Sequence, residues 1–257
     1  MPIISTAGLA RTFPGKNGPV EAVRGIDLTV RPGEILGLLG PNGAGKTTTL
    51  RMLTTLLPPT GGAATVAGHD LVKDPAAVRR RIGYVAQSGG LDPQETVRSE
   101  LVLQGRLYGL DRTRATARAE ELAVDLHLTE LLDRPTPALS GGQRRRLDLA
   151  MGLTHRPEIL FLDEPTTGLD PGSRADLWAL VRRLRDEHGT TVVLTTHYLD
   201  EADALADRLV IVDEGTVVAE GSPAALKAAH GAATLQDAFL AITGRGPAPA
   251  DTTPVAV

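Results

Sequence analysis

The stretch GPNGAGKTT at residues 40–48 decides the fold, because it contains the pattern G-x-x-x-x-G-K-[ST] of a phosphate-binding loop. It follows the apolar run ILGLL at 35–39, which is typical of a strand buried on both faces, and it opens a helix predicted over about 46–57. Two prolines, at 58 and 59, are expected to end that helix. A strand, a glycine loop and a helix in this order are the context that the pattern requires. The alternative is a glycine-rich turn with an ordinary surface lysine.

Glycines let the backbone of this loop adopt positive φ and approach an anion closely, so that its N–H groups and the positive end of the helix can surround a phosphate. Lys46 is predicted to reach the β- and γ-phosphates of a nucleotide, and Thr47 to place its hydroxyl on Mg²⁺. The loop residues expected to contact the nucleotide are Asn42, Gly43, Ala44, Gly45, Lys46, Thr47 and Thr48.

Two acidic residues, Asp163 and Glu164, follow the buried run ILFL at 159–162. They stand at the carboxyl end of a predicted strand, where open α/β sheets bind ligands. Adjacent side chains of a strand point to opposite sides, so the two carboxylates are expected to do different jobs. We assign Asp163 to the Mg²⁺ shell and Glu164 to polarising the attacking water as general base, a role that benefits if burial raises its pKa. The alternative is that both merely cap a strand end in water.

A polar residue also ends two other buried strands, Gln87 after 82–86 and His197 after 191–195. Gln87 can ligate Mg²⁺ or water through its amide oxygen, and His197 can donate a hydrogen bond to the γ-phosphate. A histidine after a strand is more often structural, but three strand ends that point polar groups toward one place favour a shared site. The candidate catalytic residues are Lys46, Gln87, Glu164 and His197, and the candidate metal ligands are Thr47, Gln87 and Asp163.

Buried strands alternate with helices around the phosphate loop, which predicts an α/β core with a mostly parallel sheet and right-handed crossovers. A helix is expected over 173–188, with Gly189 directly after it, and a further strand over 209–212. Short strands near 3–4, 20–23 and 26–30 predict a small N-terminal antiparallel sheet.

The segment of about 88–154 carries helical periodicity and no strand signal, so we interpret it as an all-helical insert. Residues 231–257 are expected to form a short C-terminal extension. Its end, from about 245, is rich in Pro, Ala and Thr without periodicity, and it is predicted to be disordered.

A second glycine-rich stretch, LSGGQ at 139–143, begins another predicted helix. Ser140 with Gln143 three residues later forms a capping box. The simple interpretation is a well-capped helix, but glycines in its first turn weaken a helix by roughly 1 kcal/mol each. Gly141 and Gly142 therefore indicate a second anion site, where backbone N–H groups face a ligand closely.

Composition limits the class of protein. The chain has 257 residues, 42% of them hydrophobic, a formal charge of −4 and no cysteine, which indicates a globular protein without disulfides or thiolate metal sites. Acids and bases are interleaved, so we expect no nucleic-acid partner. Neither a signal peptide nor a membrane span is predicted. The arginine runs at 79–81 and 144–146 are interpreted as solvated helix faces.

The chain resembles the ATP-binding subunits of ABC transporters over about residues 3–230, and six motifs occur in the family's order. They are GPNGAGKTT as Walker A, Gln87 as the Q-loop, LSGGQ as the signature, ILFLDE at 159–164 as Walker B, Gly168-Leu169-Asp170 as the D-loop, and His197 as the switch histidine. The resemblance implies a P-loop NTPase core of the ABC type over 1–230, with ATP as the nucleotide. Phe13 falls where the family places an aromatic ring that stacks on adenine, and it supplies the π-face.

The same resemblance implies why a chain of this kind carries two glycine loops. In the family, two subunits pack head to tail, and ATP on one Walker A loop is covered by the signature loop of the other. Ser140 and the N–H groups of Gly141 and Gly142 would then contact the γ-phosphate across the interface. Gln143 and Asp170 are counted with them as nucleotide-binding residues. Since every motif is intact, two identical copies are favoured over pairing with a homologous subunit.

The expected function is hydrolysis of ATP to power a separate membrane permease, with the chain at the cytoplasmic face of the membrane. The ending LQDAFLAITGR at 235–245 and the arginines at 144–146 resemble the antibiotic-resistance branch typified by daunorubicin/doxorubicin exporters, which implies export of a drug, antibiotic or lipid-like molecule. One alternative is a non-transport ABC ATPase acting on nucleic acid or ribosomes, although long coiled-coil arms and a second ATPase domain are missing from this sequence. A simple P-loop switch or kinase leaves LSGGQ and His197 unexplained.

Overall fold

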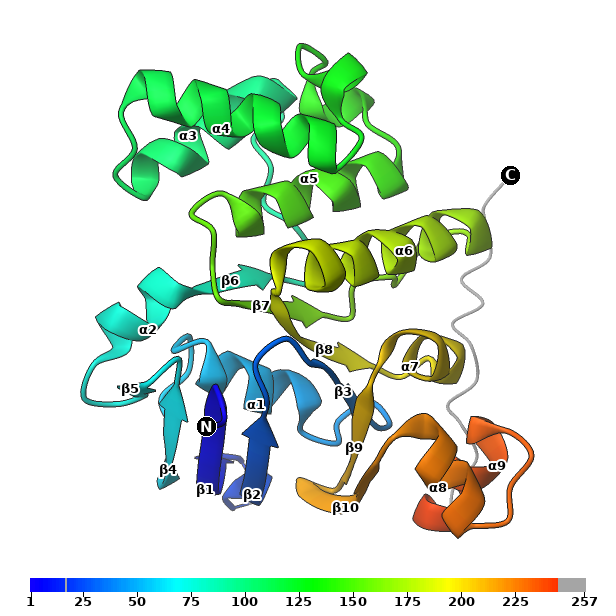
Figure 1. The fold of residues 1–257 in the computed structure, drawn as a ribbon. Coiled ribbons are helices and arrows are strands. Elements are labelled where there is room, and N and C mark those ends of the chain that lie inside the picture. Colours follow the sequence, from blue (N-terminus) through cyan, green and yellow to red (C-terminus); the bar gives the residue numbers. More distant parts are fainter. Residues whose placement is uncertain (17, 245–257) are drawn as a thin grey trace.

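A six-stranded sheet in the order β10-β9-β3-β8-β7-β6 forms the centre of the molecule in the computed structural model, which describes residues 1–16 and 18–244 (Figure 1). Strands β6, β7, β8, β3 and β9 run parallel, and β10 pairs antiparallel with β9. The strands of this sheet are β3 (Ile35–Leu39), β6 (Ile82–Val85), β7 (Ile159–Asp163), β8 (Thr191–Thr196), β9 (Arg208–Asp213) and β10 (Thr216–Gly221). The predicted α/β class with a mostly parallel sheet is confirmed.

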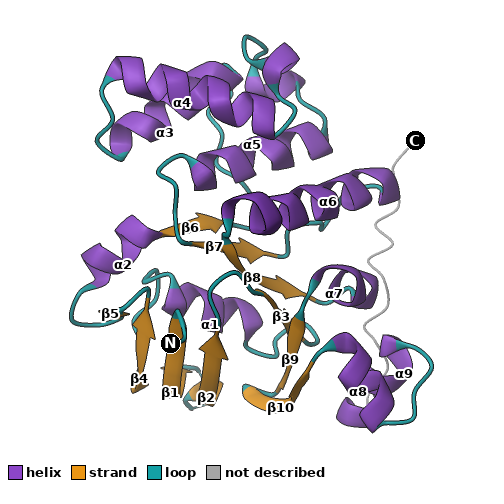
Figure 2. Cartoon of the chain, in the orientation of Figure 1, coloured by secondary structure: helices purple, strands orange, loops and turns teal. Residues whose placement is uncertain are grey.

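A second, antiparallel sheet in the order β2-β1-β4-β5 lies against the first, as the N-terminal pattern predicts (Figure 2). Its strands are β1 (Ile4–Phe13), β2 (Val20–Val30), β4 (Gly61–Val66) and β5 (His69–Asp70). The sequence pattern underestimates the first two strands. β2 is continuous through Gly25, where the sequence suggested a break, because the glycine accommodates a φ of 94° and the register with β1 shifts nearby.

The helices are α1 (Lys46–Leu53), α2 (Pro75–Arg81), α3 (Val97–Leu107), α4 (Arg112–Asp125), α5 (Gly141–Leu153), α6 (Pro171–His188), α7 (Leu199–Leu205), α8 (Pro223–Ala229) and α9 (Leu235–Thr243), with 3₁₀ turns η1 (Thr129–Leu131) and η2 (Thr136–Ala138). α1 ends four residues earlier than predicted. Thr54 caps it and Thr55 has a φ of 63°, so the chain leaves the helix before the prolines.

The central sheet is buried on both faces, and its strands divide their side chains between two cores. Along β7, Ile159 and Phe161 pack toward α1 and the antiparallel sheet, whereas Leu160 and Leu162 pack toward α5 and α6. This alternation follows from the two-residue period of a strand. A sheet covered on both sides explains why β3, β7 and β8 are apolar almost without interruption.

Helices α3, α4 and α5 lie together on the side of the molecule away from the antiparallel sheet (Figure 1). They share one core with the central sheet, in which Leu101 of α3, Leu122 of α4 and Leu147 of α5 are fully buried. No strand lies between β6 and β7, so the described chain is helical where the sequence predicts a helical insert. The limits of 88–154 for that insert and of 1–230 for the ATPase domain stay predictions.

The C-terminal helices α8 and α9 pack beside β9 and β10, where Leu226 and Phe239 join a small third core. The proposed disordered end, from about 245, lies outside the described residues. Across the described part of the chain, no helix has the length and the apolar character needed to span a membrane.

Candidate functional site

The phosphate loop, residues 40–45, connects β3 to α1, and its glycines are required by geometry. Gly45 caps α1 with a φ of 102°, and Gly43 has a φ of 81°. A Cβ added to Gly45 would lie 2.5 Å from the carbonyl oxygen of Ala22 on β2. No side chain fits there, so the backbone N–H groups at the start of α1 can face a phosphate at short range.

Lys46 is almost fully buried, with 4% of its surface exposed. Its Nζ donates to the carbonyl oxygens of Gly40 at 2.8 Å and Pro41 at 3.0 Å, so the ammonium group is held across the loop. Burial lowers the pKa of Lys46, and the nearby carboxylates of Glu164 and Asp163 oppose that effect. A buried cation beside a glycine loop is suited to neutralise phosphate charge.

Asp163 ends β7 with its carboxylate inside the protein, at 2% exposure. Its Oδ1 accepts hydrogen bonds from Thr47 Oγ1 at 2.8 Å and from Thr195 Oγ1 at 2.7 Å. The predicted pair of Thr47 and Asp163 is therefore in direct contact. Thr195 on β8 is not among the site residues predicted from the sequence. Its place near the carboxyl end of β8, two positions before His197, is a signal that could have found it.

The chemistry of these groups fits Mg²⁺. The ion prefers oxygen ligands and is commonly held by one or two carboxylates together with substrate phosphates. Thr47, Asp163 and the amide oxygen of Gln87 supply oxygen donors. Within residues 1–16 and 18–244, no three His, Cys, Asp or Glu side chains gather as a self-contained metal site. Substrate phosphates and water molecules are the ligands that Mg²⁺ commonly takes in addition to such side chains.

Glu164 follows Asp163 in a left-handed conformation, with a φ of 45°. Its N–H donates to Thr195, at 3.2 Å to the carbonyl oxygen and 3.0 Å to Oγ1. Its Oε2 accepts from Gln87 Nε2 at 3.1 Å and from Thr167 Oγ1 at 3.3 Å. His197 Nδ1 lies 3.3 Å from Oε1, without the alignment of a regular hydrogen bond. Two of the other candidate catalytic side chains, Gln87 and His197, thus contact Glu164.

The expectation that burial raises the pKa of Glu164 is wrong. The pKa of Glu164 is lowered, chiefly by His197, which outweighs the opposing effect of burial, and Lys46 contributes in the same direction. The sequence places His197 at a strand end but does not give its distance to Glu164. The carboxylate is therefore ionised at neutral pH, and it is a weaker base than a free glutamate side chain.

A cavity of about 350 Å³ joins these groups at the carboxyl edge of the parallel strands. It is lined by Ala22, Asn42, Gly43, Gly45, Lys46, Thr47, Thr48, Gln87, Glu164, Thr167 and His197. Asp163 lies beneath it through its bond to Thr47. Ala44 is not in this lining, because its methyl group packs into the core, and its contact with the nucleotide stays a prediction. Phe13 is not in the lining. It pairs with Val20 at the end of β1, and the Arg11 guanidinium covers its ring at 4.7 Å.

The second glycine loop lies outside this cavity. Ser140 caps α5, since its Oγ accepts from the Gln143 N–H at 3.3 Å and the Gln143 Oε1 accepts from the Ser140 N–H at 3.0 Å. The predicted capping box is confirmed. Ser140 and Gly141 are exposed. Gly142 has a structural reason of its own, since a Cβ there would lie 2.9 Å from Ser173 Oγ.

Asp170 also lies outside the cavity and caps α6. Its Oδ1 accepts from the Ser173 N–H at 3.0 Å and its Oδ2 from Ser173 Oγ at 2.5 Å, and these bonds lower the pKa of Asp170. The starts of α5 and α6 are therefore neighbours, joined through Gly142 and Ser173.

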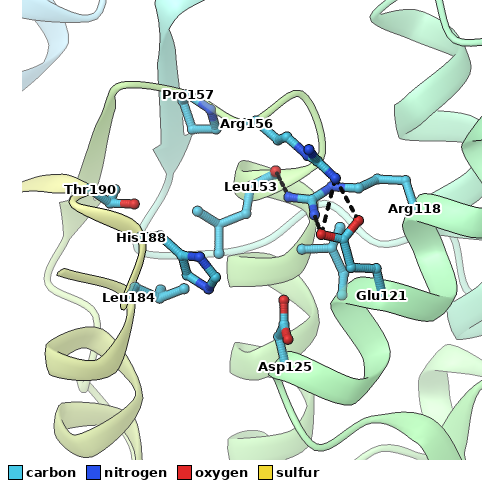
Figure 3. Close-up of a pocket in the computed structure, with 10 residues that line it drawn as sticks. Arg118, Glu121, Asp125, Leu153, Arg156, Pro157, Leu184, His188 and Thr190 are labelled. Carbon is cyan, nitrogen blue, oxygen red and sulfur yellow. Dashed lines mark hydrogen bonds and ion pairs between the residues drawn. The ribbon is translucent and has the colours of Figure 1, made fainter. Parts of the chain in front are cut away.

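Another cavity, of about 280 Å³, lies between α4, the end of α5 and the C-terminal end of α6 (Figure 3). Three of its charged groups bind one another: Glu121 pairs with Arg118 at 2.7 Å and with Arg156 at 2.8 Å. None of the predicted site residues lines it, and we assign it no chemistry.

The interpretation of 144–146 as a solvated helix face is wrong for its middle residue. Arg145 is buried, with 6% of its surface exposed, whereas Arg144 is exposed. The helical period contained the signal, because Leu149 and Gly152, four and seven residues further on, are buried on the same stripe.

A family model described as ABC transporter matches residues 23–167, more than half of the chain. The chain belongs to the ABC transporter family. Among its relatives, a daunorubicin/doxorubicin resistance ATP-binding protein of Streptomyces peucetius is 50% identical over 91% of this chain and 69% of its own length. A doxorubicin resistance ATP-binding protein of Mycobacterium tuberculosis is 46% identical over 86% of this chain and 66% of its own. A Nod factor export ATP-binding protein of Paraburkholderia xenovorans is 43% identical over 83% and 70%.

Solved structures of the family share the fold. A dimeric ATP-binding cassette in a post-hydrolysis state, bound to ADP and Pi, has a TM-score of 0.77 and 26% identity, with 85% of this chain and 98% of that chain covered. An ATP-binding subunit of an ABC transporter has a TM-score of 0.81 and 26% identity, with 94% and 99% covered. The chain is thus an ABC-type ATPase that binds and hydrolyses ATP, as the resemblance implied.

Proposed function

We propose that the chain is the ATPase subunit of an exporter, in which two copies close around two ATP molecules and drive a separate membrane permease. The observation that carries the proposal is the separation of the two glycine loops. Lys46, Gln87, Glu164 and His197 converge on one cavity, whereas Ser140 and Gly141 face solvent outside it. A loop with exposed N–H groups at a helix start is suited to a phosphate that a second copy presents.

In the proposed reaction, the phosphate loop and Lys46 hold the β- and γ-phosphates, and Glu164 takes a proton from the attacking water. His197, beside Glu164, donates a hydrogen bond to the γ-phosphate. Gln87, in contact with the same carboxylate, orients the water. Magnesium, when bound through Thr47, Asp163 and Gln87, offsets phosphate charge as a Lewis acid. Phe13 remains the proposed contact of the adenine ring, since β1 ends near Ala22 at the cavity's rim.

The second copy would complete the site. Ser140, Gly141, Gly142 and Gln143 at the start of α5, and Asp170 at the start of α6, would approach the phosphates bound by the partner. The adjacency of these two helix starts supports the assignment, because both belong to one surface. A dimeric structure of the related cassette supports it as well.

The permease partner is supported by an exposed apolar strip on α3. Leu103 and Leu107 are 51% and 73% exposed, and α3 lies on the helical side of the molecule. Tyr108, which caps the end of α3, is 41% exposed, and its ring stacks on His155. We propose that this helix and the neighbouring loop after β6 dock on the permease at the cytoplasmic face of the membrane. Relatives named for daunorubicin, doxorubicin and Nod factor export support a drug-like or lipid-like cargo.

Dimer closure is tested by the substitution Ser140→Arg. A large side chain at the start of α5 should leave binding of a fluorescent ATP analogue to the monomer unchanged, and it should abolish the ATP-dependent dimer seen by size-exclusion chromatography. An unchanged dimerisation curve would remove Ser140 from the interface.

The permease is tested by purifying the tagged chain from native membranes. A multispan protein should co-purify, and its deletion should abolish drug efflux from the cells. Full specific ATPase activity at protein concentrations far below dimerisation, or turnover that requires nucleic acid, would contradict the proposal.

A further inference from the structure

Arg145 makes three hydrogen bonds to main-chain carbonyl groups from inside the protein. Its Nε donates to Pro165 at 2.7 Å, its Nη1 to Ala86 at 2.6 Å and its Nη2 to Asp163 at 3.3 Å. The planar guanidinium presents its donors in a fixed fork, so these three acceptors are held at set positions around one rigid group. One side chain on α5 therefore joins the ends of β6 and β7.

The carbonyl groups that Arg145 binds flank the residues that act at the site. Asp163 and Pro165 stand on the two sides of Glu164, and Ala86 directly precedes Gln87. Gln87 and Glu164 also contact each other through their side chains at 3.1 Å. Arg145 thus fixes, from behind, the two backbone segments whose side chains meet in the cavity.

The backbone at Glu164 needs such support. A φ of 45° is unusual for a residue other than glycine, and conformations of this kind persist where the surroundings hold them. Arg145 binds the carbonyl before and the carbonyl after this residue, and Thr195 binds its N–H. The direction of the Glu164 side chain depends on this conformation.

Asp148, one turn after Arg145 on α5, extends the contact. Its Oδ2 lies 3.6 Å from Arg145 Nη1, and both side chains are nearly buried. A Cβ added to Gly89 would lie 2.4 Å from Asp148 Oδ1, so the carboxylate packs against the backbone two residues after Gln87. α5 therefore contacts the chain both before Gln87, through Arg145 and Ala86, and after it, through Asp148 and Gly89.

We propose that Arg145 is a positioning residue that sets Glu164 and Gln87 for hydrolysis and ties them to the helix that begins at Ser140. Arg145 is five positions after Ser140, which corresponds to a rise of about 7.5 Å along α5. A partner that contacts the start of α5 therefore acts on the same helix whose Arg145 supports the backbone around Glu164. This last step rests on the proposed dimer, whereas the positioning of Glu164 within one chain does not.

The test compares Arg145→Lys and Arg145→Gln with the control Arg144→Gln, which removes the same charge from an exposed site one residue away. Arg145→Lys keeps the charge beside Asp148 but cannot reach three carbonyls at once. We expect kcat to fall tenfold or more, on the order of the loss caused by a misplaced catalytic group. KM and the Kd for a fluorescent ATP analogue should stay within about twofold of wild type, as should all constants of the control.

A purely structural role is separated by measuring the thermal midpoint together with kcat. If Arg145 only stabilises the fold, Arg145→Lys will lower the midpoint while kcat per folded molecule stays at the wild-type value, and the proposal is overturned. If Arg145→Gln fails to fold, Arg145→Lys alone decides the question through its kcat.

Mixed dimers show whether Arg145 positions the Glu164 of its own chain or that of the partner chain. One chain carries Glu164→Gln, so the dimer keeps a single Glu164. Placing Arg145→Lys on the chain that holds this Glu164 should lower kcat, and placing it on the other chain should not. Equal losses in both placements contradict positioning within the chain. Full wild-type turnover at protein concentrations at which the chain is monomeric would instead refute the dimer, and the kcat comparison of single variants would still stand.

Discussion

Glu164→Gln is the substitution that isolates the proposed general base. The amide is close to the carboxylate in size, and its oxygen can still accept hydrogen bonds from Gln87 and Thr167, which lie 3.1 Å and 3.3 Å from Oε2. The packing of the cavity is therefore retained, while the proton acceptor is lost. A positioned base contributes about 10²–10⁴-fold, equivalent to roughly 3–5 kcal/mol of activation free energy, so kcat should fall by that factor.

Nucleotide binding should not weaken in this variant. The substitution removes a negative charge from the vicinity of Lys46 and of the bound triphosphate, which favours ATP. The assay is phosphate release at saturating ATP, together with gel filtration in ATP, where a long-lived dimer should accumulate. Glu130→Gln, on an exposed turn of the helical part, is the matched control and should behave as wild type. A kcat for Glu164→Gln within tenfold of wild type would show that another group accepts the proton.

Three further predictions concern the same cavity. Lys46→Ala should weaken ATP binding ten- to hundredfold by calorimetry, since charged hydrogen bonds are worth about 1.5–3 kcal/mol. Gly45→Ala should lower the free energy of unfolding in urea by about 1–3 kcal/mol, and by more than Gly43→Ala, because a Cβ at Gly45 meets Ala22 whereas one at Gly43 meets open space. His197→Ala removes the main cause of the lowered Glu164 pKa, so the acid limb of the pH profile of kcat should move to higher pH; a limb that does not move would refute this cause.

The site was largely predictable because its parts stand at the ends of strands. Parallel strands bring their carboxyl ends to one edge, so residues that follow β3, β6, β7 and β8 meet although they are far apart in sequence. Thr47 and Asp163, 116 positions apart, are within hydrogen-bond distance for this reason. These strands are predictable from their uninterrupted apolar runs, a pattern that burial on both faces produces.

What the sequence did not provide were distances and local backbone turns. The pKa of Glu164 depends on a 3.3 Å contact with His197, and strand order alone does not set such a distance. The early end of α1 follows from a positive φ at Thr55, which no propensity indicates for a threonine. The expectation that Arg145 is a surface residue follows from the rule that charged side chains are mostly exposed, and its three carbonyl partners lie between 18 and 59 positions away in the sequence.

The contacts of Glu164 indicate which group must move during turnover. Both carboxylate oxygens already have polar neighbours, His197 at Oε1 and Gln87 with Thr167 at Oε2. Oε2 already accepts two hydrogen bonds, so it has to exchange one of them before a water molecule can take that place. Gln87 is the exposed partner, at the start of a loop, and so it is the one expected to yield. Since Arg145 holds the carbonyl group of Ala86 just before it, the amide can swing while the backbone stays in place, which restricts the exchange to one side chain.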